Sequence, residues 1–86
     1  MSTAILEIAI LEMCRMRGTA SFCPSEVVRW MYPSSWRHFM PAVRDAMMKL
    51  YRQNLISVTQ KGIEVDKNFL PKGPVRIQPI KKTYQS

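Results

Sequence analysis

The apolar residues of this chain recur every three or four positions in its first two thirds and every second position further on. The first helical row consists of Leu6, Ala9, Ile10, Met13 and Met16. It predicts a helix that begins after Ser2 or Thr3, whose hydroxyl is expected to accept a hydrogen bond from a free backbone N–H, and that ends at Gly18. Apolar residues cover more than half of its circumference, so we expect it to be largely buried, with surplus apolar surface for a second copy of the chain.

A second helix is predicted over residues 24–31. Pro24 suits a first helical position, and Pro33 ends the helix because the residue before a proline avoids the α region. The inward side of this helix carries Val27, Val28 and Met31. Residues 19–22 lie between helix breakers and tolerate an extended backbone, so they predict a short strand before it.

A third helix is predicted from Ser34 or Ser35 to about Gln53. Its core-facing stripe consists of Trp36, Met40, Val43, Met47 and Leu50. The opposite side carries Arg37, Pro41, Arg44 and Met48. A proline inside a helix loses one backbone hydrogen bond and clashes with the preceding turn, at a cost of about 3 kcal/mol. Two arrangements remain open: one kinked helix, which we favour, or a separate turn over residues 36–39 with the long helix beginning at Pro41.

The two-residue alternation over residues 55–60 predicts a half-buried strand. Lys61-Gly62 predicts a turn, because glycine adopts positive φ without steric cost. Residues 75–77 predict a further strand. Either the arms of a hairpin pair at this turn, or the whole segment 61–74 is a longer loop between outer strands.

Together these elements predict an α+β fold, a winged helix-turn-helix with three helices and a small antiparallel β-hairpin as its wing. Because 86 residues hold one small core, we expect a single domain over residues 1–79. Residues 80–86 are expected to form a basic, fraying tail.

The chain is strongly basic, with 13 Lys and Arg against 6 Asp and Glu, a net charge of +7 and a pI near 9.9. A field of this size attracts polyanions such as nucleic acid or acidic lipid surfaces. The longest apolar run, residues 4–11, contains Glu7 and is far shorter than the ~20 residues of a membrane span. It also lacks the basic start and cleavage site of a signal peptide. We therefore expect a cytoplasmic protein with no membrane partner.

The inventory of reactive residues argues against catalysis and metal binding. Cys14 and Cys23 fit a reducing compartment as small core hydrophobes, and with His38 they would lack a fourth metal ligand. The single histidine has no neighbouring partner in the sequence, and the isolated glycines form no phosphate-binding loop. We therefore expect no enzyme, metal, cofactor or small-molecule ligand.

Several segments agree in order and spacing with one known family. They are Pro24-Ser25-Glu26-Val27, Trp36-Arg37, Met40-Pro41, Val43-Arg44, Val58-Thr59-Gln60-Lys61-Gly62, Val65-Asp66 and Gly73-Pro74-Val75-Arg76-Ile77. Over about residues 4–78 the chain resembles a small bacterial family known as domain of unknown function thirty-two fifty-three. The resemblance implies a winged-helix fold and no established activity, substrate or partner. Val28 and Met47-Met48 stand where such proteins tend to carry alanine, which implies slightly different packing.

The leading functional hypothesis is binding of double-stranded DNA, because the third helix of such a fold enters the major groove while the wing lies over the adjacent backbone. Arg37 and Arg44 would contact guanine or phosphate. The candidate nucleic-acid-binding residues are Ser34, Ser35, Arg37, His38, Arg44, Arg52, Lys61, Lys67, Lys72 and Arg76.

Other roles remain open for some of these residues. Arg37 would instead hold the fold together by pairing with Glu26 or by donating to carbonyls of the wing. Asp45 is expected to pair with a nearby base, and Arg76 alternates with apolar neighbours, which favours solvent exposure. Trp36 is expected in the core. The alternative function is a protein–protein adaptor that uses the apolar first helix, for example in a homodimer, with no DNA binding.

Overall fold

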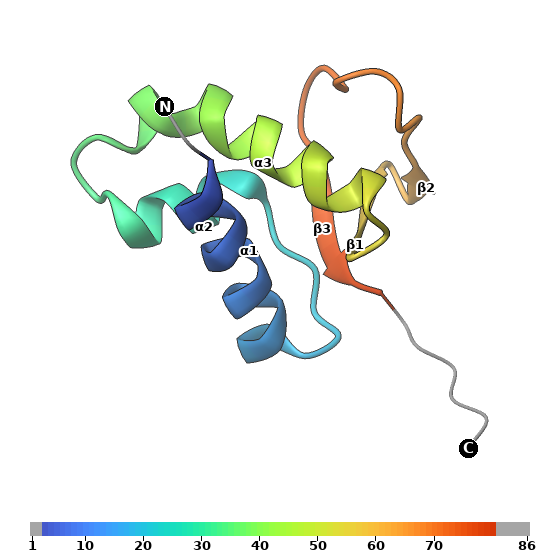
Figure 1. The fold of residues 1–86 in the computed structure, drawn as a ribbon, viewed down its shortest axis with the longest axis horizontal. Coiled ribbons are helices and arrows are strands. Elements are labelled where there is room, and N and C mark those ends of the chain that lie inside the picture. Colours follow the sequence, from blue (N-terminus) through green and yellow to red (C-terminus); the bar gives the residue numbers. More distant parts are fainter. Residues whose placement is uncertain (1–2, 81–86) are drawn as a thin grey trace.

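Residues 3–80 are described by the computed structural model, which places three α-helices, one 3-10 helix and three strands in an α+β arrangement (Figure 1). In chain order they are α1 (Ala4–Arg17), α2 (Pro24–Met31), η1 (Trp36–Phe39), α3 (Met40–Arg52), β1 (Ile56–Gln60), β2 (Ile63–Glu64) and β3 (Arg76–Pro79). This is the order of a winged helix, so the predicted fold class is confirmed. None of these helices is long and apolar enough to cross a membrane. Most of the predicted tail, from residue 81 on, lies outside the described residues.

The sheet has the order β2-β1-β3, and β1 is antiparallel to both neighbours. Lys61 and Gly62 join β1 to β2 with φ angles of 53° and 81°, positive values that a tight type I′ hairpin requires at both positions. Residues 65–75 then lead to β3 on the other edge of β1. The two arrangements left open by the sequence are therefore combined, because a tight hairpin and a longer loop between outer strands both occur.

The strand predicted over residues 19–22 is reduced to one bridge. The N–H of Phe22 donates to the carbonyl of Ile77 at 3.0 Å, and the N–H of Ile77 donates to the carbonyl of Phe22 at 2.7 Å. This bridge fixes β3 beside the segment that enters α2. The bounds predicted for α2 are confirmed, and Pro24 lies in its first turn.

The core is formed where one side of each helix meets the others and the sheet. Its largest fully buried side chains include Leu6, Ile10, Phe22, Met47, Met48 and Leu50. Ile5 and Ile8 are 57% and 66% exposed on the other side of α1. The expectation that this helix is largely buried is wrong for that side, because α2, α3 and β3 all contact its opposite side.

Thr3 directly precedes α1, but it does not cap a backbone N–H. Its hydroxyl donates instead to Oε2 of Glu7 at 2.8 Å. At the other end of the helix, Gly18 adopts a φ of 63°, and its N–H donates to the carbonyl of Cys14. The predicted end of the helix is therefore confirmed, whereas the predicted capping bond by Thr3 is wrong.

The single kinked third helix that the sequence favoured is wrong. The chain forms η1 and then α3, so Pro41 occupies the first turn of α3, where its missing N–H breaks no helical hydrogen bond. The sequence also predicted Met48 on the solvent side of the third helix. This is wrong, because Met48 is only 1% exposed. Since α3 contacts β1 as well as α1 and α2, its buried arc is wider than one stripe.

The burial of Met48 leads to a stability prediction. Met48→Ala is expected to lower the free energy of unfolding by about 2–5 kcal/mol, because it leaves a cavity in the core. The matched control is Met16→Ala on α1, where the residue is 49% exposed and the change should stay within about 0.5 kcal/mol. Urea unfolding followed by circular dichroism measures both, and equally small effects would contradict the buried position of Met48.

Candidate nucleic-acid interface

The ten residues predicted to bind nucleic acid fall into groups along the fold. Ser34, Ser35, Arg37 and His38 lie in the turn before α3 and in η1, Arg44 and Arg52 lie on α3, Lys61, Lys67 and Lys72 lie between β1 and β3, and Arg76 begins β3. Residues 61–75 are called the wing below. Arg44 and Arg52 of α3 contact the backbone of the wing, while the first group stays at the N-terminal end of α3. Their role in nucleic-acid binding stays a prediction.

The C-terminal end of α3 holds the first part of the wing. The hydroxyl of Tyr51 donates to the carbonyl of Val65 at 2.5 Å, and Nε of Arg52 donates to the carbonyl of Lys67 at 2.9 Å. The ammonium of Lys67 donates in turn to Oδ1 of Asn54 and lies 5.1 Å from the centre of the Tyr51 ring. Two of the predicted cations, Arg52 and Lys67, are therefore neighbours at this end of the helix.

Arg44 and Gln60 hold the second part of the wing. Nη2 of Arg44 donates to the carbonyls of Pro71 and Gly73, the latter at 3.3 Å. Nε2 of Gln60 donates to the carbonyls of Lys72 and Pro74, at 2.5 and 3.2 Å. Residues 65–75 belong to no strand, so their carbonyls need donors from elsewhere. The sequence contains no signal for this role of Arg44 and Gln60, because the carbonyls they contact lie at least twelve residues away.

Arg76 ties β3 to the segment before α2. Its Nε donates to Oγ of Ser21 at 3.0 Å, and its Nη2 donates to the carbonyl of the same residue at 2.9 Å. Nη1 lies 3.4 Å from Sγ of Cys23. Arg76 is exposed, as its alternation with apolar neighbours indicated, but its N–H groups are already used within the protein.

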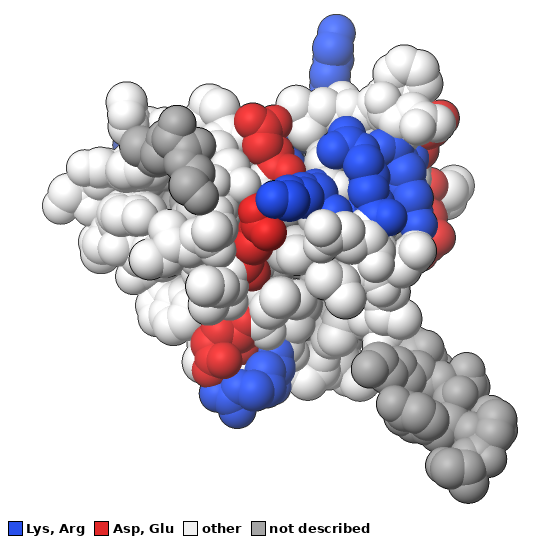
Figure 2. Space-filling model, viewed as in Figure 1, with Lys and Arg blue, Asp and Glu red and all other residues white. Residues whose placement is uncertain are grey.

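The carboxylates neutralise cations mainly around α1. Ion pairs join Arg15 to Glu12, Arg17 to Glu26 at 2.7 Å and Lys49 to Glu7 at 3.4 Å. The other eight Lys and Arg in residues 3–80 have no carboxylate within ion-pair distance, and they are Arg29, Arg37, Arg44, Arg52, Lys61, Lys67, Lys72 and Arg76. Figure 2 shows Lys and Arg side chains gathered over the end of the molecule where Figure 1 places the C-terminal end of α3 and the wing.

Two carboxylates differ in their surroundings. The pKa of Glu26 is lowered by the hydrogen bond that its side chain accepts from the backbone N–H of Cys23, at 2.9 Å, and by its pair with Arg17. Asp45 on α3 has no ion pair within the described part of the chain, so the expectation that it pairs with a nearby base is wrong.

Arg29 and Arg37 both lie over the ring of Trp36. Their guanidinium carbons lie 4.1 and 4.5 Å from its centre. Trp36 is partly buried and packs against the core, as its spacing indicated. The structural roles considered for Arg37 do not occur, because Glu26 pairs with Arg17 and Arg37 donates to no wing carbonyl. Ser35 precedes η1 without a capping side-chain bond.

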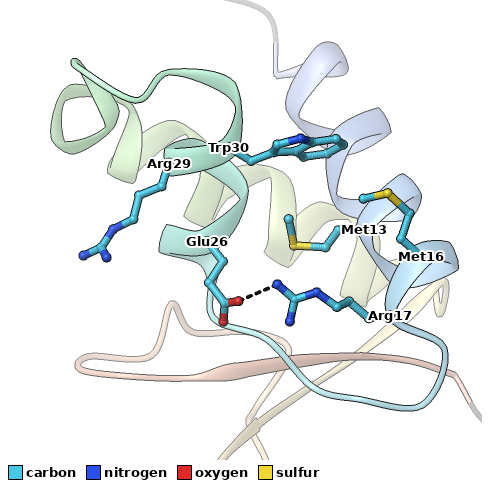
Figure 3. Close-up of a pocket in the computed structure, with 6 residues that line it drawn as sticks. All are labelled: Met13, Met16, Arg17, Glu26, Arg29 and Trp30. Carbon is cyan, nitrogen blue, oxygen red and sulfur yellow. Dashed lines mark hydrogen bonds and ion pairs between the residues drawn. The ribbon is translucent and has the colours of Figure 1, made fainter.

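A hollow of about 440 Å³ lies between α1 and α2 (Figure 3). Met13 and Met16 of α1 face Trp30 of α2 across it, and the ion pair between Arg17 and Glu26 closes one side. Its lining is mainly apolar, so it offers a contact surface for another apolar group and no reactive side chain.

No cluster of three or more His, Cys, Asp or Glu side chains that could hold a metal ion occurs within residues 3–80. Cys14 and Cys23 are free thiols. Burial raises the pKa of Cys14 to about 11, so its thiol stays protonated and unreactive at neutral pH.

Comparison with known proteins gives one family. The model of a family described as "Protein of unknown function (DUF3253)" matches residues 3–79, nearly the whole chain. It confirms the resemblance found in the sequence motifs. No curated protein matches the chain.

The contacts of Arg44 lead to a prediction about the wing. Arg44→Met keeps most of the side-chain stem but removes hydrogen bonds from a charged group, each worth about 1.5–3 kcal/mol. Amide hydrogen exchange should therefore become faster in residues 65–75 and stay unchanged in α1 and α2. Arg37→Met is the matched control, since this guanidinium contacts no carbonyl of the wing. Equal exchange in the two variants would count against Arg44 as the residue that holds the wing.

Proposed function

The chain belongs to the DUF3253 family of proteins of unknown function, and for this member we propose that it binds double-stranded DNA through the backbone phosphates. The wing and α3 form the contact surface. The observation that carries this proposal is the uneven neutralisation of charge, since each of the three ion pairs of residues 3–80 includes a residue of α1.

The end of α3 and the wing keep their positive charge. Residues 52–76 contain five Lys and Arg but only two carboxylates, Glu64 and Asp66. The first of these accepts a hydrogen bond from Ser57 at 2.8 Å, and the second from the N–H of Asn68, so neither forms an ion pair. Lys and Arg that neutralise phosphates release condensed counterions, which is the main source of affinity for DNA irrespective of its sequence.

The contacts of the two arginines on α3 favour phosphate binding over the reading of bases. Bidentate recognition of guanine requires a free pair of N–H groups on the arginine. Arg44 and Arg52 are each tied to the wing by hydrogen bonds to its carbonyls, so they supply charge and hold the wing in place. We therefore propose weak dependence on base sequence. We place this activity in the cytoplasm, where free thiols such as Cys14 and Cys23 persist.

A salt titration tests the proposal. With five cations in contact, the logarithm of the association constant for a random duplex should fall with the logarithm of salt concentration with a slope of roughly −4.5. Lys72→Gln should weaken binding and reduce the size of this slope by about 0.9. Arg15→Gln removes the same charge from α1 and is expected to leave the slope unchanged. Fluorescence anisotropy measures all three proteins, and no binding of the unaltered chain at about 50 mM salt would overturn the proposal.

The exposed side of α1 favours a second candidate function, self-association as a protein–protein adaptor. Ile5, Ile8 and Leu11 are exposed there, and Trp30 is exposed beside the hollow. Two chains of charge +7 repel each other, but the carboxylates neutralise the cations around α1. A second copy of the chain therefore meets the least electrostatic opposition on this face.

The homodimer is tested by one pair of isoleucine substitutions. Burial of one isoleucine contributes about 1.5–3 kcal/mol, so Ile8→Glu should weaken a dimer at least about tenfold. Ile63→Glu changes an isoleucine that is 73% exposed on β2 and should leave association unchanged. Sedimentation velocity over a range of protein concentrations measures both. A chain that stays monomeric at millimolar concentration would exclude this candidate.

A further inference from the structure

Five of the seven arginines in residues 3–80 use their N–H groups within the protein. Carboxylates accept from Arg15 and Arg17, and backbone carbonyls or Ser21 accept from Arg44, Arg52 and Arg76. Arg29 and Arg37 are different, because neither makes a hydrogen bond or an ion pair anywhere in that part of the chain.

These two arginines converge on one ring although they come from different elements. Arg29 extends from α2 away from Trp30, and Arg37 lies in η1 (Figure 3 shows Arg29). Their guanidinium groups lie 4.1 and 4.5 Å from the centre of the Trp36 ring. A cation–π contact uses no N–H donor, and neither guanidinium makes a hydrogen bond within residues 3–80, so their N–H groups stay free to donate.

The turn between α2 and η1 is held in place independently of the two arginines. The rings of Tyr32 and Phe39 stack with their centres 4.0 Å apart and nearly parallel planes. Tyr32 and Phe39 also pack against the core together with Trp36. The ring that orients the guanidinium groups is therefore held by the core, which lowers the entropy lost when an anion binds.

We propose that Arg29, Trp36 and Arg37 form a phosphate clamp, in which the guanidinium edges donate to phosphodiester oxygens of the DNA backbone. The inference rests on the proposed DNA binding and adds a second contact region to it. Paired N–H groups of a guanidinium match two oxygens of one phosphate, and such charge-assisted hydrogen bonds are among the strongest in proteins. An anion also relieves the repulsion between two cations that share one ring.

The position of the clamp suits a duplex. It lies at the N-terminal end of α3, whereas Arg52 lies at the C-terminal end and holds the first part of the wing. The thirteen residues of α3 span about 18–20 Å at 1.5 Å per residue. A major groove is about 12 Å wide, so contacts at the two ends of the helix reach the backbones on both sides of one groove. Ser34 and Ser35, which are exposed beside the clamp, supply further donors.

A substitution that preserves charge distinguishes the contribution of the clamp to DNA affinity from that of the protein's overall positive charge. Arg29→Lys together with Arg37→Lys keeps the net charge but removes the planar N–H forks. We expect duplex affinity to fall about tenfold, the effect of losing one or two charge-assisted hydrogen bonds. Arg15→Lys together with Arg17→Lys makes the same chemical change on α1 and should leave affinity unchanged. The thermal midpoints of both double variants check that they fold.

Nuclear magnetic resonance of the arginine Nε–H groups provides a direct readout on the unaltered chain. Addition of a random duplex should shift the signals of Arg29 and Arg37 and leave that of Arg15 in place. Unchanged affinity in the Lys variant, with unshifted Arg29 and Arg37 signals, overturns the clamp while DNA binding itself stands. Absence of any duplex binding overturns both proposals. If a glutamate-rich peptide shifts these signals and the duplex does not, the site binds acidic protein and the clamp for phosphate is wrong.

Discussion

The backbone carbonyls of the wing accept hydrogen bonds from side chains of α3 and β1 instead of from a neighbouring strand. Residues 65–75 follow the short strand β2 and belong to no strand, so the carbonyls of this loop have no partner from a regular sheet ladder. Six of those carbonyls accept hydrogen bonds from four side chains, those of Tyr51, Arg52, Arg44 and Gln60. The path of the wing over α3 depends on these bonds, and so does the position of its lysines.

Because the wing carbonyls take up some of the arginines, the cations of the protein fall into groups with different partners. Cations around α1 pair with carboxylates, and Arg44, Arg52 and Arg76 donate to the backbone or to side chains of neighbouring segments. Only the first arrangement cancels charge, since a carbonyl is a neutral acceptor. The wing therefore combines a fixed shape with an uncancelled positive field, a combination that suits a partner with regularly spaced negative charges.

The two proposed binding surfaces lie on different elements. The proposed DNA surface extends over α3, the wing and the turn before η1, whereas the apolar side of α1 lies outside it. Self-association through α1 and phosphate binding through the wing are therefore compatible, and one protein can do both. In that case one dimer would carry two basic wings, and the second contact with DNA would become intramolecular.

Much of the fold could be predicted because the backbone preferences of single residues decide where its helices and turns begin and end. Gly18 ends α1 and Pro24 opens α2 at the positions where their backbone preferences apply, and Lys61-Gly62 forms the predicted turn. Pro41 shows where such a rule has two outcomes, since a proline is costly inside a helix and favourable in its first turn. The chain adopts the second, and the sequence alone did not decide between them.

The sequence by itself determined the order of helices and strands and the excess of positive charge, because periodicity, turn residues and titrating groups are local properties. Only the tertiary structure decided which cations are neutralised, which hold the wing and which remain free, because a guanidinium finds its acceptor in whatever segment folding brings near. Arg44 reaches a carbonyl 27 residues away, and Arg76 reaches a hydroxyl 55 residues away. The burial of Met48 follows the same logic, since it depends on the contact between α3 and β1.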